Sequence, residues 1–188
     1  AITVDGGTAN TLAVGTIETN DFGVVTINSG ADTITSLAVD ATLGNDAALT
    51  VVSTNDVSGS ALSAKSVTVD VGDLTLSNDV ASSAGNISLT SDEGVAANDV
   101  TATGGSVTIT ADTADITTTG ITAGTGKDLS LTAVDIAVTG NLAGDDISLA
   151  ASNDSANDTN AINGDVTAAN DVNITDGTFT ATNMTAND

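Results

Sequence analysis

The chain lacks histidine, cysteine, proline, tryptophan and tyrosine, and it has two phenylalanines among 188 residues. Without imidazole or thiol groups there is no histidine general base, no serine–histidine or cysteine–histidine pair, and no nitrogen or sulfur ligand for zinc or haem. Carboxylates, amides and hydroxyls remain. These groups favour a structural role, cation binding or carbohydrate binding over covalent catalysis.

Positive charge is also scarce, because two Lys and Arg stand against 25 Asp and Glu and give a formal net charge of -23. Nucleic-acid binding requires many Lys and Arg to neutralise phosphates, so we exclude nucleic acid as a partner. The chain has no run of 18 apolar residues and no basic segment followed by an apolar one at its start, so the sequence predicts neither a membrane span nor a signal peptide. It begins with Ala1 rather than Met, which we interpret as a piece of a longer protein.

Large apolar residues are few, and whether the chain folds depends on their pattern. Leu, Ile, Val and Phe total 45 of the 188 residues. This fraction is just above the level of roughly 20% below which a highly charged chain stays disordered. Composition alone therefore favours a folded chain only narrowly.

Triplets of an apolar, a polar and an apolar residue recur along the chain at intervals of 18 to 25 residues. Such alternation predicts a β-strand, and its recurrence is typical of a solenoid that adds one coil per repeat. The coils are predicted to start near residues 2, 25, 49, 67, 87, 107, 129, 147 and 172, with Ile2-Thr3-Val4, Val25-Thr26-Ile27, Leu49-Thr50-Val51, Val67-Thr68-Val69, Ile87-Ser88-Leu89, Val107-Thr108-Ile109, Leu129-Ser130-Leu131, Ile147-Ser148-Leu149 and Val172-Asn173-Ile174.

Two further apolar residues stand between successive triplets in the middle of the chain. They are Leu74 and Val80, Val95 and Val100, Ile116 and Ile121, and Ile136 and Leu142. Three short strands per coil predict a roughly triangular cross-section, with Gly, Asn, Asp and Ser at the corners. The sequence thus predicts an all-β fold, a parallel β-helix (β-solenoid) of about nine coils of 18–25 residues, in a single domain over residues 1–188.

An antiparallel β-sandwich would also suit regular short strands. The scarcity of aromatic residues counts against it, since a sandwich core about 10 Å thick usually needs some large side chains. Helices are disfavoured because the chain lacks a 3.6-residue apolar period and is rich in Thr, Asn, Asp, Gly and Val. We therefore favour the solenoid.

The interval after the eighth triplet is irregular, and residues 150–163 are predicted to form a longer loop at one corner. Asp154, Asp158 and Asp165 are the best candidate ligands there for Ca²⁺ or another divalent cation, although we expect no required cofactor. The segment differs from the twelve-residue calcium loop, because Ile162 stands where that pattern has a ligand.

The dipeptide Asn-Asp occurs nine times in the chain. One interpretation is a corner that repeats because the coils repeat, since Asn and Asp tolerate turn geometry and bond their own backbone. The other is that carboxylates of neighbouring coils, about 4.8 Å apart, share hard cations. In either case, high ionic strength or divalent ions should stabilise so acidic a chain.

Carboxylate pairs such as Asp145 with Asp146, or Asp112 with Asp115, could serve glycoside hydrolysis. With 25 acidic residues some pairs are expected by chance, and sugar sites normally add aromatic platforms or Arg and Lys. We therefore predict that the chain is not an enzyme, and a carbohydrate-active β-helix stays the weakest alternative.

The two termini resemble an internal junction. Joining the final Ala-Asn-Asp to the initial Ala-Ile-Thr-Val imitates residues 169–174, and Ile174 would then stand 18 residues before the next Val4. Because solenoid ends are open strand edges, we expect a head-to-tail homopolymer or a slice of a longer repeat protein. Phe22 and Phe179, near opposite ends, are either ordinary core residues or plugs for the coil.

Several phrases of the middle repeats resemble those of filamentous-haemagglutinin-like bacterial exoproteins. They are Asp-Leu-Thr-Leu (73–76), Gly-Asn-Ile-Ser-Leu-Thr (85–90), Gly-Gly-Ser-Val-Thr-Ile-Thr-Ala (104–111), Lys-Asp-Leu-Ser-Leu-Thr-Ala (127–133) and Asp-Asp-Ile-Ser-Leu-Ala-Ala (145–151). The resemblance covers nearly half of the chain well. It implies a right-handed parallel β-helix, secretion to the bacterial surface, and a role in adhesion or in an extracellular fibre.

We therefore expect a non-enzymatic extracellular or cell-surface protein of bacteria, a β-solenoid that builds a filament, sheath or biofilm-matrix fibre with itself as partner. The alternative is the stalk or binding module of a secreted adhesin, in which the predicted loop at 150–163 contacts a glycan, a host protein or another surface component. Long uniform fibres would favour the first, and monomers that bind glycans the second.

Overall fold

The computed structural model describes residues 2–5, 11–18, 24–30, 33–40, 47–152, 160–175 and 179–187. All the regular structure in these ranges is β-strand, and all the strand pairs between them are parallel. Parallel pairing excludes the antiparallel sandwich. The chain forms a β-solenoid.

One sheet, called sheet A here, contains nine strands, one from each predicted triplet. Neighbouring strands pair so that the first residue of one triplet faces the first residue of the next, as Ile87 faces Val107. The triplets therefore predicted the strands of this sheet, and the structure adds that equivalent positions of successive triplets pair in register. The strands of sheet A are β1 (Ile2–Asp5), β4 (Val24–Gly30), β6 (Ala48–Ser53), β8 (Ser66–Val71), β11 (Ile87–Ser91), β14 (Val107–Ala111), β17 (Leu129–Ala133), β20 (Ile147–Ala151) and β22 (Val172–Thr175).

The other strands form a second sheet, sheet B, of 14 strands. In the middle turns, each of the two further apolar residues predicted per coil lies in a strand of its own. The strands of sheet B are β2 (Thr11–Ala13), β3 (Thr16–Glu18), β5 (Thr33–Asp40), β7 (Val57–Ala64), β9 (Leu74–Leu76), β10 (Val80–Ser82), β12 (Val95–Ala96), β13 (Asp99–Ala102), β15 (Ile116–Thr118), β16 (Gly120–Thr122), β18 (Ile136–Val138), β19 (Leu142–Gly144), β21 (Ala161–Ala168) and β23 (Thr180–Thr185).

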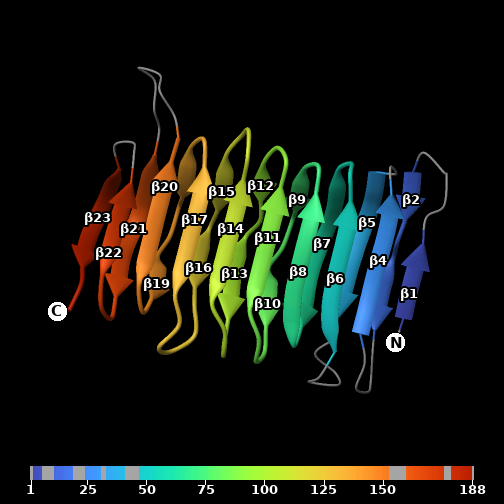
Figure 1. Ribbon diagram of the computed structural model, residues 1–188, viewed down its shortest axis with the longest axis horizontal. Coiled ribbons are helices and arrows are strands. Elements are labelled where there is room, and N and C mark those ends of the chain that lie inside the picture. Colours follow the sequence, from blue (N-terminus) through green and yellow to red (C-terminus); the bar gives the residue numbers. More distant parts are fainter. Residues whose placement is uncertain are drawn as a thin grey trace.

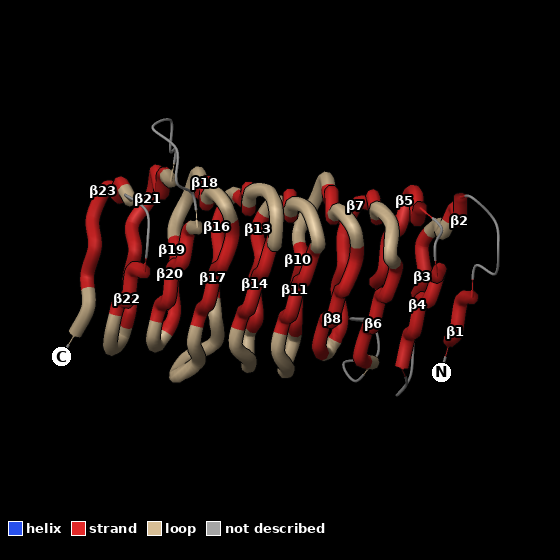
Figure 2. The backbone as a smooth tube through the Cα atoms, turned by 45° about the horizontal axis from the view of Figure 1, so that its top comes forward, coloured by secondary structure: helices blue, strands red, loops and turns tan. Residues whose placement is uncertain are grey.

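The cross-section differs somewhat from the predicted triangle. A corner separates the second strand from the third in the middle turns, as between β9 and β10, but β7 and β21 run through both positions without a break. These long strands join the second and third columns into one sheet. The solenoid therefore consists of two facing layers, sheet A and a bent sheet B (Figure 2).

The predicted number of about nine coils is slightly too high, and the solenoid has about seven turns. Sheet A has nine strands, of which the seven between β1 and β22 have a neighbouring strand on both sides. In Figure 1 the chain rises through sheet A in front, descends through sheet B behind and advances from right to left, so the solenoid is right-handed. This hand is the usual one for crossovers between parallel strands.

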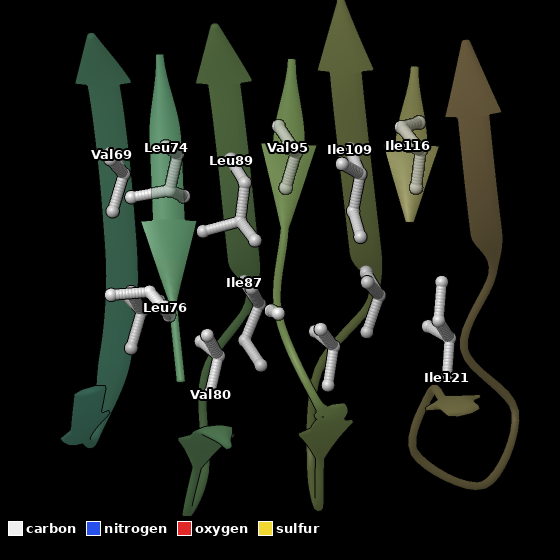
Figure 3. Close-up of a cluster of buried hydrophobic side chains, with 14 of the residues drawn as sticks. Val69, Leu74, Leu76, Val80, Ile87, Leu89, Val95, Ile109, Ile116 and Ile121 are labelled. Carbon is white, nitrogen blue, oxygen red and sulfur yellow. The ribbon is translucent and has the colours of Figure 1, made fainter. Parts of the chain in front are cut away.

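Aliphatic side chains fill the space between the two layers (Figure 3). In β11, Ile87, Leu89 and Ser91 are buried, whereas the residues between them face outward and are half-buried. This alternation repeats from turn to turn, so each inward position becomes a column of stacked side chains along the axis. Each buried Leu or Ile contributes roughly 1.5–3 kcal/mol relative to an exposed one.

Asn and Asp side chains at the corners accept hydrogen bonds from the backbone of the next turn. Asp79 Oδ1 accepts from the N–H of Asp99 (3.3 Å), and Asn86 Oδ1 accepts from the N–H of Ser106 (3.0 Å). These bonds satisfy donors that the strand ladders leave free at the corners. They support the interpretation of the Asn-Asp dipeptides as repeated corner residues.

Gly105 stands where successive turns approach too closely for any side chain. Gly105 is buried, and a Cβ atom there would overlap the carbonyl group of Gly85 in the preceding turn. We expect Gly105→Ala to lower the free energy of unfolding by about 1–3 kcal/mol, since overpacking forces the backbone to shift. Urea denaturation measures the loss. Gly15→Ala is the control, because a Cβ atom at Gly15 meets no atom within 4 Å, and equal losses at both positions would contradict the prediction.

Candidate functional site

The predicted cation ligands divide between described and undescribed parts of the chain. Asp154 and Asp158 lie outside the described residues, as does their arrangement around Asp165. Asp165 lies in β21 and is hydrogen-bonded to a side chain of the turn on each side. Its N–H donates to Asn141 Oδ1 (2.9 Å), and its Oδ1 accepts from Asn183 Nδ2 (2.7 Å). Asp165 therefore has a structural role in joining three successive turns. The described residues contain no group of three or more carboxylates arranged to hold a metal ion.

The predicted longer loop at 150–163 is shorter at both ends than expected. Strand β20 continues to Ala151 and β21 begins at Ala161. Asn160, directly before β21, is 3% exposed, and its Oδ1 accepts a hydrogen bond from the N–H of Ile136 (2.8 Å). The Asn160 side chain thus fixes the last residue of the connection to the preceding turn, because it accepts a hydrogen bond from that turn's backbone.

Three carboxylates, Asp128, Asp146 and Asp171, stand at one corner in consecutive turns. Each precedes the triplet of its turn, and the strands β17, β20 and β22 that follow them pair in register. Asp146 Oδ1 also accepts from the N–H of Asp171 (3.2 Å). Neighbouring turns lie about 4.8 Å apart, so each adjacent pair repels by about 1 kcal/mol in water before salt screens it.

The carboxylate pairs considered for glycoside hydrolysis line none of three surface hollows that the described residues form. The hollows of about 330 and 450 Å³ are lined by neutral residues, and the one of about 240 Å³ has Asp99 as its single carboxylate. Asp145 accepts a hydrogen bond from Asn170 Nδ2 (3.1 Å), and Asp112 and Asp115 are exposed. No observation on these residues supports sugar hydrolysis.

Both ends of the solenoid expose apolar residues that are buried in the middle turns. Ile2 at the amino-terminal end is 36% exposed, and Ile174 and Met184 at the carboxy-terminal end are 38% and 47% exposed. Residues of the same columns in central turns, such as Ile109 and Leu142, are fully buried. The outermost described turns therefore leave apolar residues of the core columns partly exposed. The sequence indicated this only through the resemblance of its termini to an internal junction.

The apolar residues at the two ends belong to the same columns. We call the first set the head face and the second the tail face. The head face contains Ile2, Val4, Leu12 and Ile17, and the tail face contains Val172, Ile174, Phe179 and Met184, in the same order of columns. Phe179 packs against the end of the core, whereas Phe22 lies outside the described residues.

A comparison with protein-family models, with curated proteins and with solved structures finds no significant match. The described residues also include no helix of the length and hydropathy needed to cross a membrane. Inferences about function therefore depend on the geometry of the solenoid and on the pattern of its sequence.

Proposed function

We propose that this chain is a non-enzymatic structural protein, a β-solenoid subunit that stacks head to tail into a filament, sheath or matrix fibre at the surface of a bacterium. The observation that carries this proposal is the correspondence of apolar columns between the head face and the tail face. The resemblance to filamentous-haemagglutinin-like exoproteins supports the extracellular location. The mechanism is mechanical, because continuous hydrogen-bond ladders and an aliphatic core carry load along the axis.

Stacking would pair β22 of one subunit with β1 of the next. In the register of sheet A, Val172 would face Ile2 and Ile174 would face Val4, as Ile147 faces Val172 within the chain. Covering a large apolar side chain that is about 40% exposed contributes roughly 1 kcal/mol. Unpaired N–H and C=O groups of the two edge strands would also gain partners, which favours strand addition at an uncapped edge.

Ile174→Asp is expected to abolish end-to-end stacking, because it places a charge in the middle of the tail face. Asn173→Asp is the matched control, since it adds the same charge to the same strand at the neighbouring, outward-facing position. Sedimentation velocity and electron microscopy at rising protein concentration measure assembly. Filaments that persist in Ile174→Asp, or a chain that stays monomeric without any substitution, would contradict the proposal.

One observation favours the alternative function as an adhesin stalk. The connection from β20 to β21 spans residues 152–160, whereas the equivalent connection from β17 to β18 has only Val134 and Asp135. A long connection at one corner of a regular solenoid is a common place for a binding loop. Glycan-array binding by the monomer, lost when residues 153–159 are deleted, would support this alternative.

A further inference from the structure

The outer face of sheet A carries two rows of outward-facing side chains, one at the middle residue of each triplet and one two residues later. The first row is Thr3, Thr26, Thr50, Thr68, Ser88, Thr108, Ser130, Ser148 and Asn173, and the second is Asp5, Asn28, Val52, Asp70, Thr90, Thr110, Thr132, Ala150 and Thr175. Hydroxyl groups occupy most positions of both rows in the central turns.

Three consecutive strands, β11, β14 and β17, carry hydroxyls at every position of the two rows. We call these six residues the hydroxyl block: Ser88, Thr90, Thr108, Thr110, Ser130 and Thr132. All six are exposed or half-buried, and the described part of the chain offers no hydrogen-bond partner to their hydroxyls. Elsewhere hydroxyls are used internally, as when Thr113 Oγ1 donates to the carbonyl of Asp92 (2.7 Å). Each hydroxyl of the block can therefore donate one hydrogen bond and accept two from an external ligand.

The hydroxyl block is uncharged in a protein with a net charge of -23. On either side it is bounded by Asp70 and Ala150 in the second row. The high strand propensity of Thr accounts for hydroxyls in any strand of this solenoid. It does not account for a complete block, because the outward positions of sheet B in the same turns mix Thr with Ala, as at Ala96, Thr117 and Ala137.

A regular array of hydroxyls fits a ligand that repeats in two dimensions. Neighbouring strands lie about 4.8 Å apart and alternate residues of one strand about 6.7 Å apart, so the block is a nearly rectangular grid. Tetrahedral hydrogen bonding with O···O distances of about 2.75 Å places second-neighbour oxygens of ice about 4.5 Å apart and repeats the lattice about every 7.3 Å along its hexagonal axis.

The mismatch between the two grids limits the size of a matching surface. It is about 0.3 Å per turn along the axis, which is small across three turns and reaches half a lattice repeat across about eight. A block of three turns is therefore long enough to contact several lattice oxygens and short enough to stay in register. We propose that the hydroxyl block is an ice-binding surface, with the Thr and Ser hydroxyls occupying positions equivalent to lattice waters.

The experiment uses the 188-residue chain, its Thr110→Tyr variant and a matched control, Thr122→Tyr. Thr110 lies in the block, whereas Thr122 lies in the same turn on the outer face of sheet B, in β16. The measurements are thermal hysteresis and inhibition of ice recrystallisation, with circular dichroism to confirm folding. We expect both activities in the unmodified chain, their loss in Thr110→Tyr and their retention in Thr122→Tyr.

A second variant, Thr108→Tyr, tests the other row and is expected to lose both activities as well. An unmodified chain with no effect on ice would overturn the inference, as would equal losses in Thr110→Tyr and Thr122→Tyr. Co-sedimentation with crystalline cellulose or chitin provides a further arm. Block-dependent binding to these polysaccharides without any effect on ice would also overturn it, since the ligand would then be a neutral glycan.

Discussion

Ile109→Ala is expected to lower the free energy of unfolding by about 2–5 kcal/mol, whereas Ile174→Ala should lower it by about 1 kcal/mol or less. The two isoleucines occupy the same column of sheet A, so side chain and local backbone are matched. They differ in burial, because Ile109 has neighbours in both adjacent turns and Ile174 is 38% exposed at the tail face. Removing Ile109 leaves a cavity that the stacked turns on both sides cannot close.

Urea denaturation of dilute, monomeric protein measures both changes. A solenoid is stabilised mainly by contacts between adjacent turns, so a central lesion weakens two interfaces and a terminal lesion weakens one. Equal losses at the two positions would contradict this account of the core. Under conditions where the chain stacks, Ile174→Ala should also weaken assembly, because the tail face then has less apolar surface to cover.

The strands could be predicted from the sequence because apolar residues recur at the inward-facing positions once in every turn of a solenoid. Each triplet has a polar residue between two apolar ones, and all nine triplets lie in strands of sheet A, with equivalent positions paired in register. The second and third strands were predicted equally well in the middle turns, where Leu74 begins β9 and Val80 begins β10. Burial inside a narrow coil leaves little freedom in where such residues lie.

Features that depend on contacts between particular turns could not be predicted in this way. Asn160 occupies a column position that Ile116 and Ile136 fill in earlier turns, and polarity alone placed it in a loop. Its burial follows from the need of the Ile136 N–H for an acceptor. In the same way, the hydrogen bonds by which Asp165 joins three turns depend on Asn141 and Asn183, which lie one turn before it and one turn after it.

The hydroxyl block and the correspondence of the head face and the tail face also could not be predicted from the amino-acid composition. Thr and Ser favour strands in general, and only the register shows that six of them form a complete grid on one face. The resemblance of the termini to an internal junction suggested stacking. That β23 and β3 carry residues of the same column could be seen only from the strand pairs of sheet B.

Low ionic strength is expected to destabilise the protein strongly. A chain with 25 acidic and two basic side chains repels itself, and lowering NaCl from about 0.5 M to 0.01 M lengthens the screening distance from a few Å to about 30 Å. If a few kcal/mol of repulsion return, the melting temperature should fall by about 10 °C. Thermal melts across this range measure the change, and a flat or opposite dependence would contradict the expectation.

Asp146→Asn locates part of this repulsion, and it should raise the melting temperature at low salt by several degrees, since about 1–2 kcal/mol of repulsion is removed from the stack of Asp128, Asp146 and Asp171. The amide oxygen can still accept from the N–H of Asp171. Asp70→Asn is the control, because Asp70 pairs in register with Val52 and Thr90 and has no carboxylate above or below it. Equal gains would mean that net charge acts without regard to position.

A larger gain in melting temperature in CaCl₂ than in NaCl of the same ionic strength, reduced by Asp146→Asn, would show that divalent cations relieve the repulsion by bridging the stacked carboxylates.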